Sequence, residues 1–339
     1  MKTRISSTIK FGVLVALVVT FVVAGGISIF TWLAPDTVIS LIQRLRTSEP
    51  LVQHQLKGIA VLGDSQSDEY RADDARGKNF DTVTYNWVEL LQREKNLNFG
   101  KWEVNPEPRR TGYAYNWAQS GATARSMIVS GQHVGVAEQI KSGEVNTAII
   151  YIGANDYAPF ITEDGYNALY EGTLTDAQII EKRNNIVADI KTAVDVLQNA
   201  GEVKIIIVAI PHWSNNFGIS LIFPIPERRK HVVEAVTDTN NEIKKMAVEY
   251  GIPVIDPNEF YTKITAENNG SVKIGNIRLE RLLINNDPKN MFLDDGIHTG
   301  TALNALFANE VIDSLNRSLG TNLSTFTPEE IIKVSGLDR

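Results

Sequence analysis

The sequence predicts an α/β fold built around a parallel β-sheet. Apolar, strand-like runs alternate along the chain with segments of helical periodicity, which is the pattern of βαβ units. The runs are continuous in valine and isoleucine, as expected for strands buried on both faces. The expected strands cover residues 58–62, 146–152, 203–210 and 252–256, and the expected helices cover 83–95, 123–139, 175–200 and 227–250.

The chain begins with a basic segment followed by a long apolar run. Residues 1–10 contain basic side chains and no acid, and residues 11–33 carry no charge. Because about 20 apolar residues cross a bilayer as a helix, we expect a retained transmembrane signal anchor. The upstream basic residues then place the N-terminus in the cytoplasm and the rest of the chain outside. The alternative is a signal peptide cleaved near the small residues 24–26, which would release a secreted protein.

Three further parts are expected after the apolar run. Residues 34–56 have roughly helical apolar spacing and are expected to form a juxtamembrane stalk, although a helix packed on the main domain would give the same pattern. The main domain is expected over residues 57–320, with its last helix at 301–318. Residues 321–339 form a C-terminal extension with a short helix at 328–334.

Composition excludes several classes of protein. The chain has 339 residues, a formal net charge of −7 and no cysteine. The acidic balance argues against nucleic-acid binding, which uses basic surfaces. The lack of cysteine excludes disulfides and thiolate metal sites. The length suffices for one large α/β domain with attachments.

Two glycine-containing turns lie next to expected secondary structure in the first half of the domain. The first expected strand ends in Gly-Asp-Ser, which places Ser65 at the carboxyl end of a strand, where α/β proteins bind ligands. Gly121, in Ser-Gly-Ala-Thr, precedes an expected helix, and its N–H is a candidate donor to an oxyanion. Ordinary turns or helix caps would explain either stretch by itself.

Two polar stretches in the second half complete the set. Asn155, in Gly-Ala-Asn-Asp, follows a buried strand, and its amide is a neutral donor suited to a developing negative charge. Asp295 and His298 lie three residues apart in a glycine-rich turn, where the carboxylate can orient the imidazole. The alternatives are an Asx turn or a helix cap at Asn155 and Asp156 and, for Asp294, Asp295 and His298, a metal cluster or a cap of the last helix.

Taken together, the four stretches resemble the SGNH hydrolases, also called the GDSL esterase/lipase family. Ser65, Gly121, Asn155 and His298 match the four residues of the family name, in family order. The resemblance covers about residues 57–318 and implies a flavodoxin-like, three-layer α/β/α fold. Gln66 departs from the leucine usual in the family, which bears on substrate fit rather than chemistry.

The resemblance implies a serine hydrolase that needs no cofactor or metal. Ser65 would attack an ester carbonyl, His298 would carry the proton, and Asp295 would orient His298. The oxyanion hole would consist of the backbone N–H groups of Ser65 and Gly121 and the side chain of Asn155.

Further residues are candidates for substrate binding. The apolar segment 217–226 is expected to be a loop that forms either an acyl-binding wall or a part of the core. The candidate side chains are Gln66, Asp156, His212, Phe217 and Phe223.

The sequence therefore predicts a membrane-anchored, extracytoplasmic serine esterase. Acyl lipids and acetylated cell-wall or exported polysaccharides are two alternative substrate classes. A non-catalytic, membrane-held binding module that keeps the fold is the alternative from another class. The expected partners are a small-molecule or lipid ester and the membrane, with no nucleic acid.

Overall fold

The computed structural model describes residues 55–72, 75–106, 109–266, 270–282 and 285–339, and residues Gln53–Arg339 form one compact unit. The expected cytoplasmic segment, the apolar run and nearly all of the stalk lie outside the described residues. Within those residues, no helix is long and apolar enough to span a bilayer.

A parallel sheet lies at the centre of the unit, as the sequence predicts. Its strands are β1 (Ile59–Gly63), β4 (Thr147–Tyr151), β5 (Lys204–Val208) and β6 (Val254–Ile255), in the order β1-β4-β5-β6. Val61, Ile149 and Ile206 stand side by side across the three longer strands. Parallel pairing brings the carboxyl ends of all four strands to one edge of the sheet.

The stretch before Gly121 runs beside β1, on the side away from β4. Asn116 forms a parallel bridge with Val61, and Val61 N donates to Tyr115 O at 3.0 Å. Further along, Gln119 N donates to Gly63 O at 3.1 Å. This pairing carries the chain toward Gly121 next to the end of the strand that precedes Ser65.

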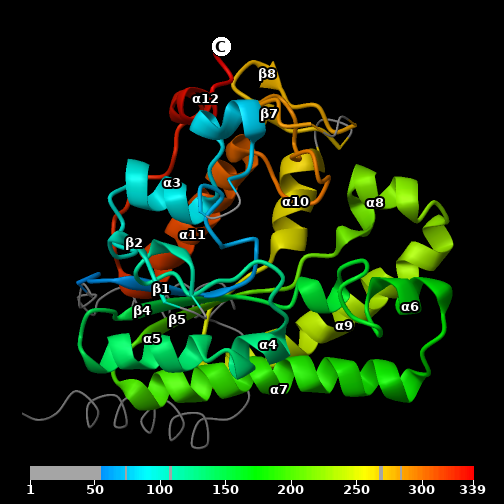
Figure 1. The fold of residues 1–339 in the computed structure, drawn as a ribbon, viewed down its shortest axis with the longest axis horizontal. Coiled ribbons are helices and arrows are strands. Elements are labelled where there is room, and N and C mark those ends of the chain that lie inside the picture. Colours follow the sequence, from blue (N-terminus) through cyan, green and yellow to red (C-terminus); the bar gives the residue numbers. More distant parts are fainter. Residues whose placement is uncertain (1–54, 73–74, 107–108, 267–269, 283–284) are drawn as a thin grey trace, which may run out of the picture. The chain divides into compact units, whose positions relative to one another are not determined.

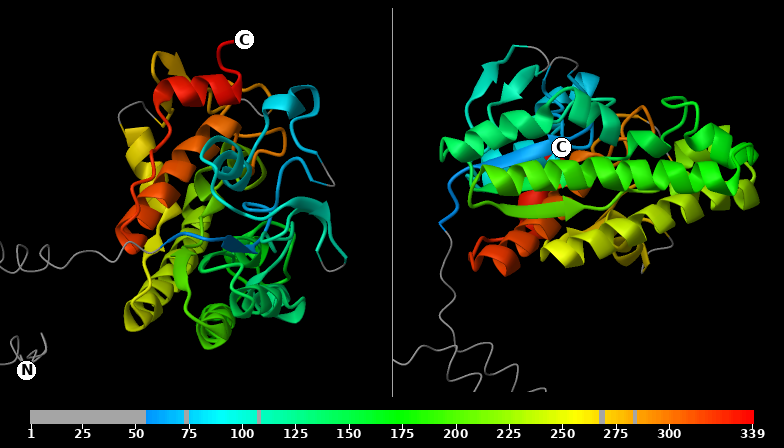
Figure 2. Two further views of the ribbon diagram at one scale, coloured as in Figure 1. Left: turned by 90° about the vertical axis from the view of Figure 1, so that its left-hand side faces the viewer. Right: turned by 90° about the horizontal axis from the view of Figure 1, so that it is seen from below.

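Helices cover both faces of the sheet, so the unit has three layers (Figure 1). Alternate strand residues enter separate cores: Leu62 and Ile150 face one, and Val61 and Ile149 face the other. The first core is covered by α4 (Ala124–Val129), α5 (Gln132–Lys141), α6 (Tyr166–Glu171), α7 (Asp176–Ala200), α8 (Phe217–Ile222) and α9 (Pro226–Tyr250). The second is covered by α3 (Trp87–Glu94), α10 (Pro257–Thr265), α11 (Thr301–Leu319) and α12 (Pro328–Ser335). Figure 2 shows the long helices α7 and α9 side by side on one face of the sheet.

Three helical expectations need correction. The single helix expected at 123–139 is two helices, α4 and α5, because Gly131 between them adopts a φ of +77°. The helix expected from residue 83 begins at Trp87, after the 3-10 turn η2 (Lys78–Val83) and a capping box made by Asn86 and Glu89. The expected loop at 217–226 contains α8 and the first residue of α9.

Several short elements were not predicted. Two antiparallel ribbons pair β2 (Trp102–Val104) with β3 (Thr111–Tyr113) and β7 (Lys273–Ile274) with β8 (Ile277–Arg278). Two 3-10 turns, η3 (Asn155–Tyr157) and η4 (Trp213–Asn215), follow β4 and β5. All are too short to show a clear periodicity.

The C-terminal segment packs on the domain. Ile331 and Leu337 are buried in the core that contains α11. Lys95 Nζ donates to Thr325 O at 3.1 Å and pairs with Glu330 at 3.0 Å. Residues 321–339 therefore contribute to the same compact unit as the sheet.

Candidate active site

Ser65, His298 and Asp295 form a continuous hydrogen-bonded chain. Ser65 Oγ lies 2.8 Å from His298 Nε2, and His298 Nδ1 lies 2.6 Å from Asp295 Oδ2. Ser65 follows β1, whereas the other two residues come from the turn before α11, more than 200 residues away. Both Ser65 and His298 are largely buried. This is the geometry of a nucleophile, a base and a group that orients the base.

The environment of Asp295 keeps it ionised. Although burial raises the pKa of the Asp295 carboxyl, hydrogen bonds and charge attraction from His298 and backbone N–H bonds hold that pKa well below its ordinary value. A carboxylate 2.6 Å from Nδ1 requires the proton to be on Nδ1. Nε2 is then the acceptor that can take the hydroxyl proton of Ser65.

The turn that carries Asp295 and His298 is stabilised by hydrogen bonds between its own residues. Asp295 Oδ1 accepts from Ile297 N at 2.9 Å and from His298 N at 2.8 Å. Gly296 adopts a φ of +69°, a conformation that favours glycine. A bridge between Phe292 and Thr299 closes the base of the turn. Local hydrogen bonds within the turn thus help to position the imidazole.

Asn155 is hydrogen-bonded to the residue that follows Gly121. Asn155 is 9% exposed, and its Nδ2 donates to Ala122 O at 2.9 Å, which leaves a second N–H on the same amide. Gly121 has a φ of +84°, and among the described residues no atom beyond the glycine and its two chain neighbours lies within 4 Å of the position that a Cβ would occupy. Asn155 and the Gly121 stretch are therefore neighbours, with open space beside the glycine.

Asp68 supports the same stretch, a role that the sequence analysis did not assign. Its Oδ2 accepts from both the backbone N and the Oγ of Ser120, each at 2.7 Å. Burial raises the pKa of the Asp68 carboxyl, and the two bonds from Ser120 oppose that rise. Asp68 thereby fixes the residue before Gly121.

Two other buried carboxylates lie close to the strand ends. Burial raises the pKa of Asp64 to about 7 and that of Asp156 to about 6. Asp64 Oδ1 accepts from Gln66 N, and Asp156 Oδ2 accepts from Ala124 N at the start of α4, both at 2.9 Å. For Asp156, a candidate for substrate binding, these contacts favour the helix-capping interpretation.

The other candidates for substrate binding are spread over the same edge of the sheet. Gln66 is buried, its carbonyl accepts from Trp87 Nε1 at 3.1 Å, and its Nε2 has no hydrogen-bond partner among the described residues. Phe217 begins α8 and is half-buried. Phe223 is buried, with ring centroids 4.6 Å from Tyr166 and 5.0 Å from Tyr170. Phe223 is therefore part of the core, which corrects its expected place in the cleft.

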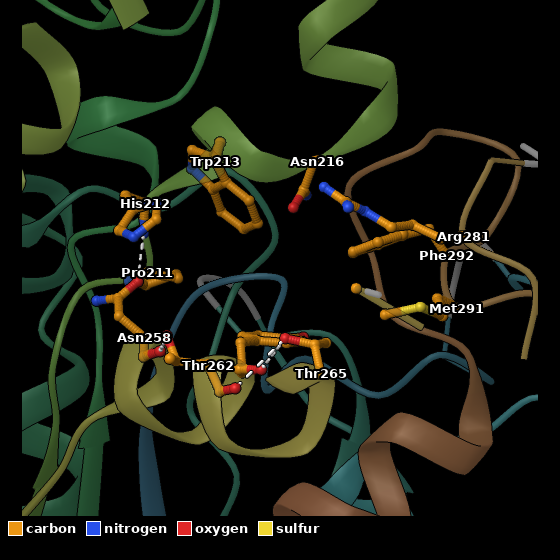
Figure 3. Close-up of a pocket in the computed structure, with 12 residues that line it drawn as sticks. Pro211, His212, Trp213, Asn216, Asn258, Thr262, Thr265, Arg281, Met291 and Phe292 are labelled. Carbon is orange, nitrogen blue, oxygen red and sulfur yellow. Dashed lines mark hydrogen bonds between the residues drawn. The ribbon is translucent and has the colours of Figure 1, made fainter. Parts of the chain in front are cut away.

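His212 lines a separate cavity at the ends of β5 and β6. The cavity has a volume of about 310 Å³, and neither Ser65 nor His298 lines it. Its wall includes Trp213, Asn258 and Phe292, which Figure 3 shows around the central space with His212 at one side. Burial lowers the pKa of His212 below its ordinary value. In the part of the chain that the structure describes, no hydrogen bond connects His212 to Ser65, His298 or Asp295.

The described residues give no support to the alternative of a metal cluster. In that part of the chain, no group of three or more His, Asp or Glu side chains is arranged to hold a metal ion. Asp295 binds His298, while Asp294 forms an ion pair with Lys78.

Sequence reasoning also missed Arg76, which contacts the Asp295–His298 pair. Its Nη1 lies 3.0 Å from Asp295 Oδ2 and 3.1 Å from His298 Nδ1. Arg76 belongs to no motif, and nothing in the sequence around it indicates this contact.

The fold and the family comparison define a carboxylic ester hydrolase. A family model described as GDSL-like lipase/acylhydrolase matches residues 59–311, which include Ser65, Gly121, Asn155 and His298. The chain belongs to this family, as its resemblance to the SGNH hydrolases predicts. Comparison with curated protein sequences gives no match.

Several solved structures are similar to the chain at low sequence identity. A GDSL-like lipase from Bacteroides thetaiotaomicron is 10% identical, with 83% of this chain and 98% of that chain covered and a TM-score of 0.41. An acetylxylan esterase from Geobacillus stearothermophilus is 16% identical, with coverage of 80% and 98% and a TM-score of 0.39. A lipase from a goat rumen metagenome is 11% identical, with coverage of 77% and 97% and a TM-score of 0.46.

Proposed function

We propose that this protein is a serine esterase in which Ser65, His298 and Asp295 act as one catalytic unit. The hydrogen-bonded chain from Ser65 Oγ through His298 to Asp295 is the observation that supports the proposal. Ser65 Oγ attacks the ester carbonyl carbon as its proton passes to His298 Nε2. The same proton then goes to the leaving alkoxide as the bond from the acyl carbon to the alcohol oxygen breaks.

Water completes the reaction. It attacks the acyl group on Ser65 while His298 Nε2 takes a proton from it, and the proton returns to Ser65 Oγ as the carboxylic acid leaves. In both tetrahedral states, the oxyanion accepts hydrogen bonds from the backbone N–H groups of Ser65 and Gly121 and from the side-chain amide of Asn155. Asp295 stabilises the imidazolium that forms twice in the cycle.

The direct test of this function is hydrolysis of an activated short-chain ester. Ser65→Ala should lose nearly all turnover and keep a near-wild-type unfolding midpoint, because it removes a single hydroxyl oxygen and leaves the rest of the side chain in place. Retention of wild-type turnover by folded Ser65→Ala would exclude the mechanism. A non-catalytic binding module, the alternative class, predicts no turnover by the wild-type protein either.

We further propose that the enzyme is held at a membrane by residues 11–33 and acts outside the cytoplasm on acyl lipids. Support comes from a group of exposed apolar side chains, the apolar rim, on segments that follow β4 and β5. The apolar rim consists of Phe160, Ile161, Leu221, Ile222 and Ile225, which are 41% to 70% exposed. The two segments meet where the Phe160 ring lies 5.9 Å from the buried Phe223 ring. Exposed apolar groups of this kind mark interaction sites.

The second candidate substrate is an acetylated polysaccharide, and a panel of acyl lengths separates the two. For an acyl-lipid esterase, Leu221→Ser should lower kcat/KM on long-chain esters several-fold and leave acetyl esters unaffected. Val248→Ser is the matched control, since Val248 is 79% exposed near the end of α9. Equal activity of Leu221→Ser and wild type on long chains, with acetylated glycans preferred, would establish the deacetylase alternative instead.

A further inference from the structure

Arg76 and His298 share one oxygen of Asp295. Arg76 Nη1 lies 3.0 Å from Asp295 Oδ2, and His298 Nδ1 lies 2.6 Å from the same atom. The two nitrogen atoms are 3.1 Å apart. An arginine nitrogen can only donate, so it forms no hydrogen bond to an Nδ1 that carries a proton. Both groups therefore donate to the carboxylate, and a fixed positive charge stands beside the imidazole.

Arg76 is held in this place by Tyr70. The guanidinium carbon lies 5.5 Å from the centroid of the Tyr70 ring, and Arg76 N donates to Tyr70 O at 2.7 Å. Tyr70 is itself buried, and its ring stands edge-on to the His298 ring at 6.0 Å. The Tyr70 hydroxyl donates to Thr299 O at 3.3 Å. The Arg76 side chain is only 25% exposed, so its charge is partly shielded from water.

The charges around His298 come from several segments. Asp295 and Arg76 face Nδ1, Ser65 faces Nε2, and Tyr70 faces the ring edge. Farther out, Asp68 interacts electrostatically with Arg76, and Lys78 pairs with Asp294 on the same turn as His298. Within this set, Arg76 is the positive charge in direct contact with the imidazole.

Arg76 and Asp295 favour different neutral tautomers of the His298 imidazole. The carboxylate accepts from Nδ1–H, which leaves Nε2 free to accept the Ser65 proton. Without the carboxylate, Arg76 can donate to an unprotonated Nδ1, which moves the proton to Nε2. In that tautomer the imidazole cannot accept the proton of Ser65. In either case the arginine charge disfavours a second proton on the ring.

We propose that Arg76 is a positioning residue of the catalytic unit, one that fixes the Asp295 carboxylate and holds a positive charge beside the imidazole of His298. The proposal rests on the proposed function of Ser65, His298 and Asp295. Its consequence is that removal of the arginine should change the pH dependence of activity, which a purely structural contact would not do.

The first test is the pH profile of kcat/KM on a small uncharged ester, whose acidic limb reports the base of the free enzyme. Arg76→Met should move the acidic limb up by about one pH unit, the size expected for removal of an adjacent charge. Arg76→Lys should move it less, because it keeps the charge. Lys78→Met is the matched control, which removes the neighbouring ion pair with Asp294 and should leave the limb in place. A limb that is unmoved in both Arg76 variants would overturn the proposal.

The second test uses the tautomer argument. In Asp295→Ala, Arg76 should hold the unproductive tautomer and activity should fall by roughly 10⁴, the cost of that tautomer in a serine protease. The double variant Asp295→Ala with Arg76→Ala should recover activity by about tenfold or more, since nothing then binds Nδ1. A double variant no faster than Asp295→Ala would contradict the proposal.

Circular dichroism and the unfolding midpoint should be measured on every variant. A purely structural role for Arg76 predicts a lower midpoint with an unmoved pH limb. Failure of the proposed function is distinguishable, because it would show as activity that persists in Ser65→Ala. If Ser65→Ala is inactive and the limb of Arg76→Met does not move, only the inference about Arg76 fails.

Discussion

Replacement of Asn155 by alanine separates the catalytic role of this residue from its structural one. In the proposed mechanism, one N–H of the Asn155 amide binds Ala122 O at 2.9 Å and the other meets the oxyanion. Loss of one oxyanion donor typically lowers kcat by about 10²–10³, or roughly 3–4 kcal/mol of transition-state stabilisation. Because that interaction forms only in the tetrahedral state, KM should change little.

The same substitution also has a predictable effect on stability. It leaves the carbonyl of Ala122 without its buried partner, which costs about 1–3 kcal/mol of unfolding free energy. Asn240→Ala is a matched control on α9, since the Asn240 amide binds both the N and the O of Ile210 at 2.8 Å. Asn240→Ala should lose stability by a similar amount and keep kcat in the folded enzyme.

The assay is steady-state kinetics on a soluble ester together with thermal unfolding of the same samples. We expect Asn155→Ala to be destabilised and slow, and Asn240→Ala to be destabilised with normal turnover. An Asn155→Ala protein with wild-type kcat would refute the oxyanion role and leave Asn155 as a turn residue that holds Ala122.

Three further predictions follow from the site and the sequence. His298→Ala should abolish esterase activity as fully as Ser65→Ala, and the double variant should be no slower, because the two residues act as one unit; additive losses in steady-state assays would contradict this. Burial raises the pKa of Glu69 from its ordinary value of 4.5 to about 8. The native state then holds a proton that the unfolded state has lost, so stability should fall as pH rises from about 4.5 to 8, and Glu69→Gln should flatten that decline in denaturant titrations. The full-length protein should sediment with membranes and retain residues 11–33 on N-terminal sequencing; a mature chain that begins near Gly25 or later would indicate a cleaved signal peptide.

Patterns of apolar residues were enough to predict the central sheet. Each expected strand is present in a parallel sheet because a continuous run of isoleucine and valine, as in Lys204–Val208, is stable only where both faces are covered. The long helices α7 and α9 begin within one residue of the expected positions. Their regular periodicity and the glycines that follow them mark their limits.

Local chemistry explains what the patterns missed in the fold. The break between α4 and α5 depends on one left-handed glycine, Gly131, inside a segment whose apolar periodicity is otherwise helical. The segment 217–226 was expected to be a loop because it follows a strand end, whereas six of its residues form α8, which buries Ile219 and leaves Leu221 and Ile222 exposed.

The site shows the same division between local and long-range information. Strand ends and a glycine-rich turn indicated Ser65 and His298, and the structure places their side chains 2.8 Å apart. The contacts of Asp68 with Ser120 and of Arg76 with Asp295 join segments that are 52 and 219 residues apart. No spacing rule predicts such pairs, because they depend on how irregular segments fold over the sheet edge.

The central claim is that Ser65 is the nucleophile of a serine esterase. The most direct measurement is labelling of the folded protein with a fluorophosphonate, followed by mass spectrometry of its peptides. The account predicts a single covalent adduct on Ser65, lost in Ser65→Ala and strongly slowed in His298→Ala, together with loss of ester hydrolysis. An adduct on another serine, or undiminished hydrolysis after Ser65 is blocked, would contradict it.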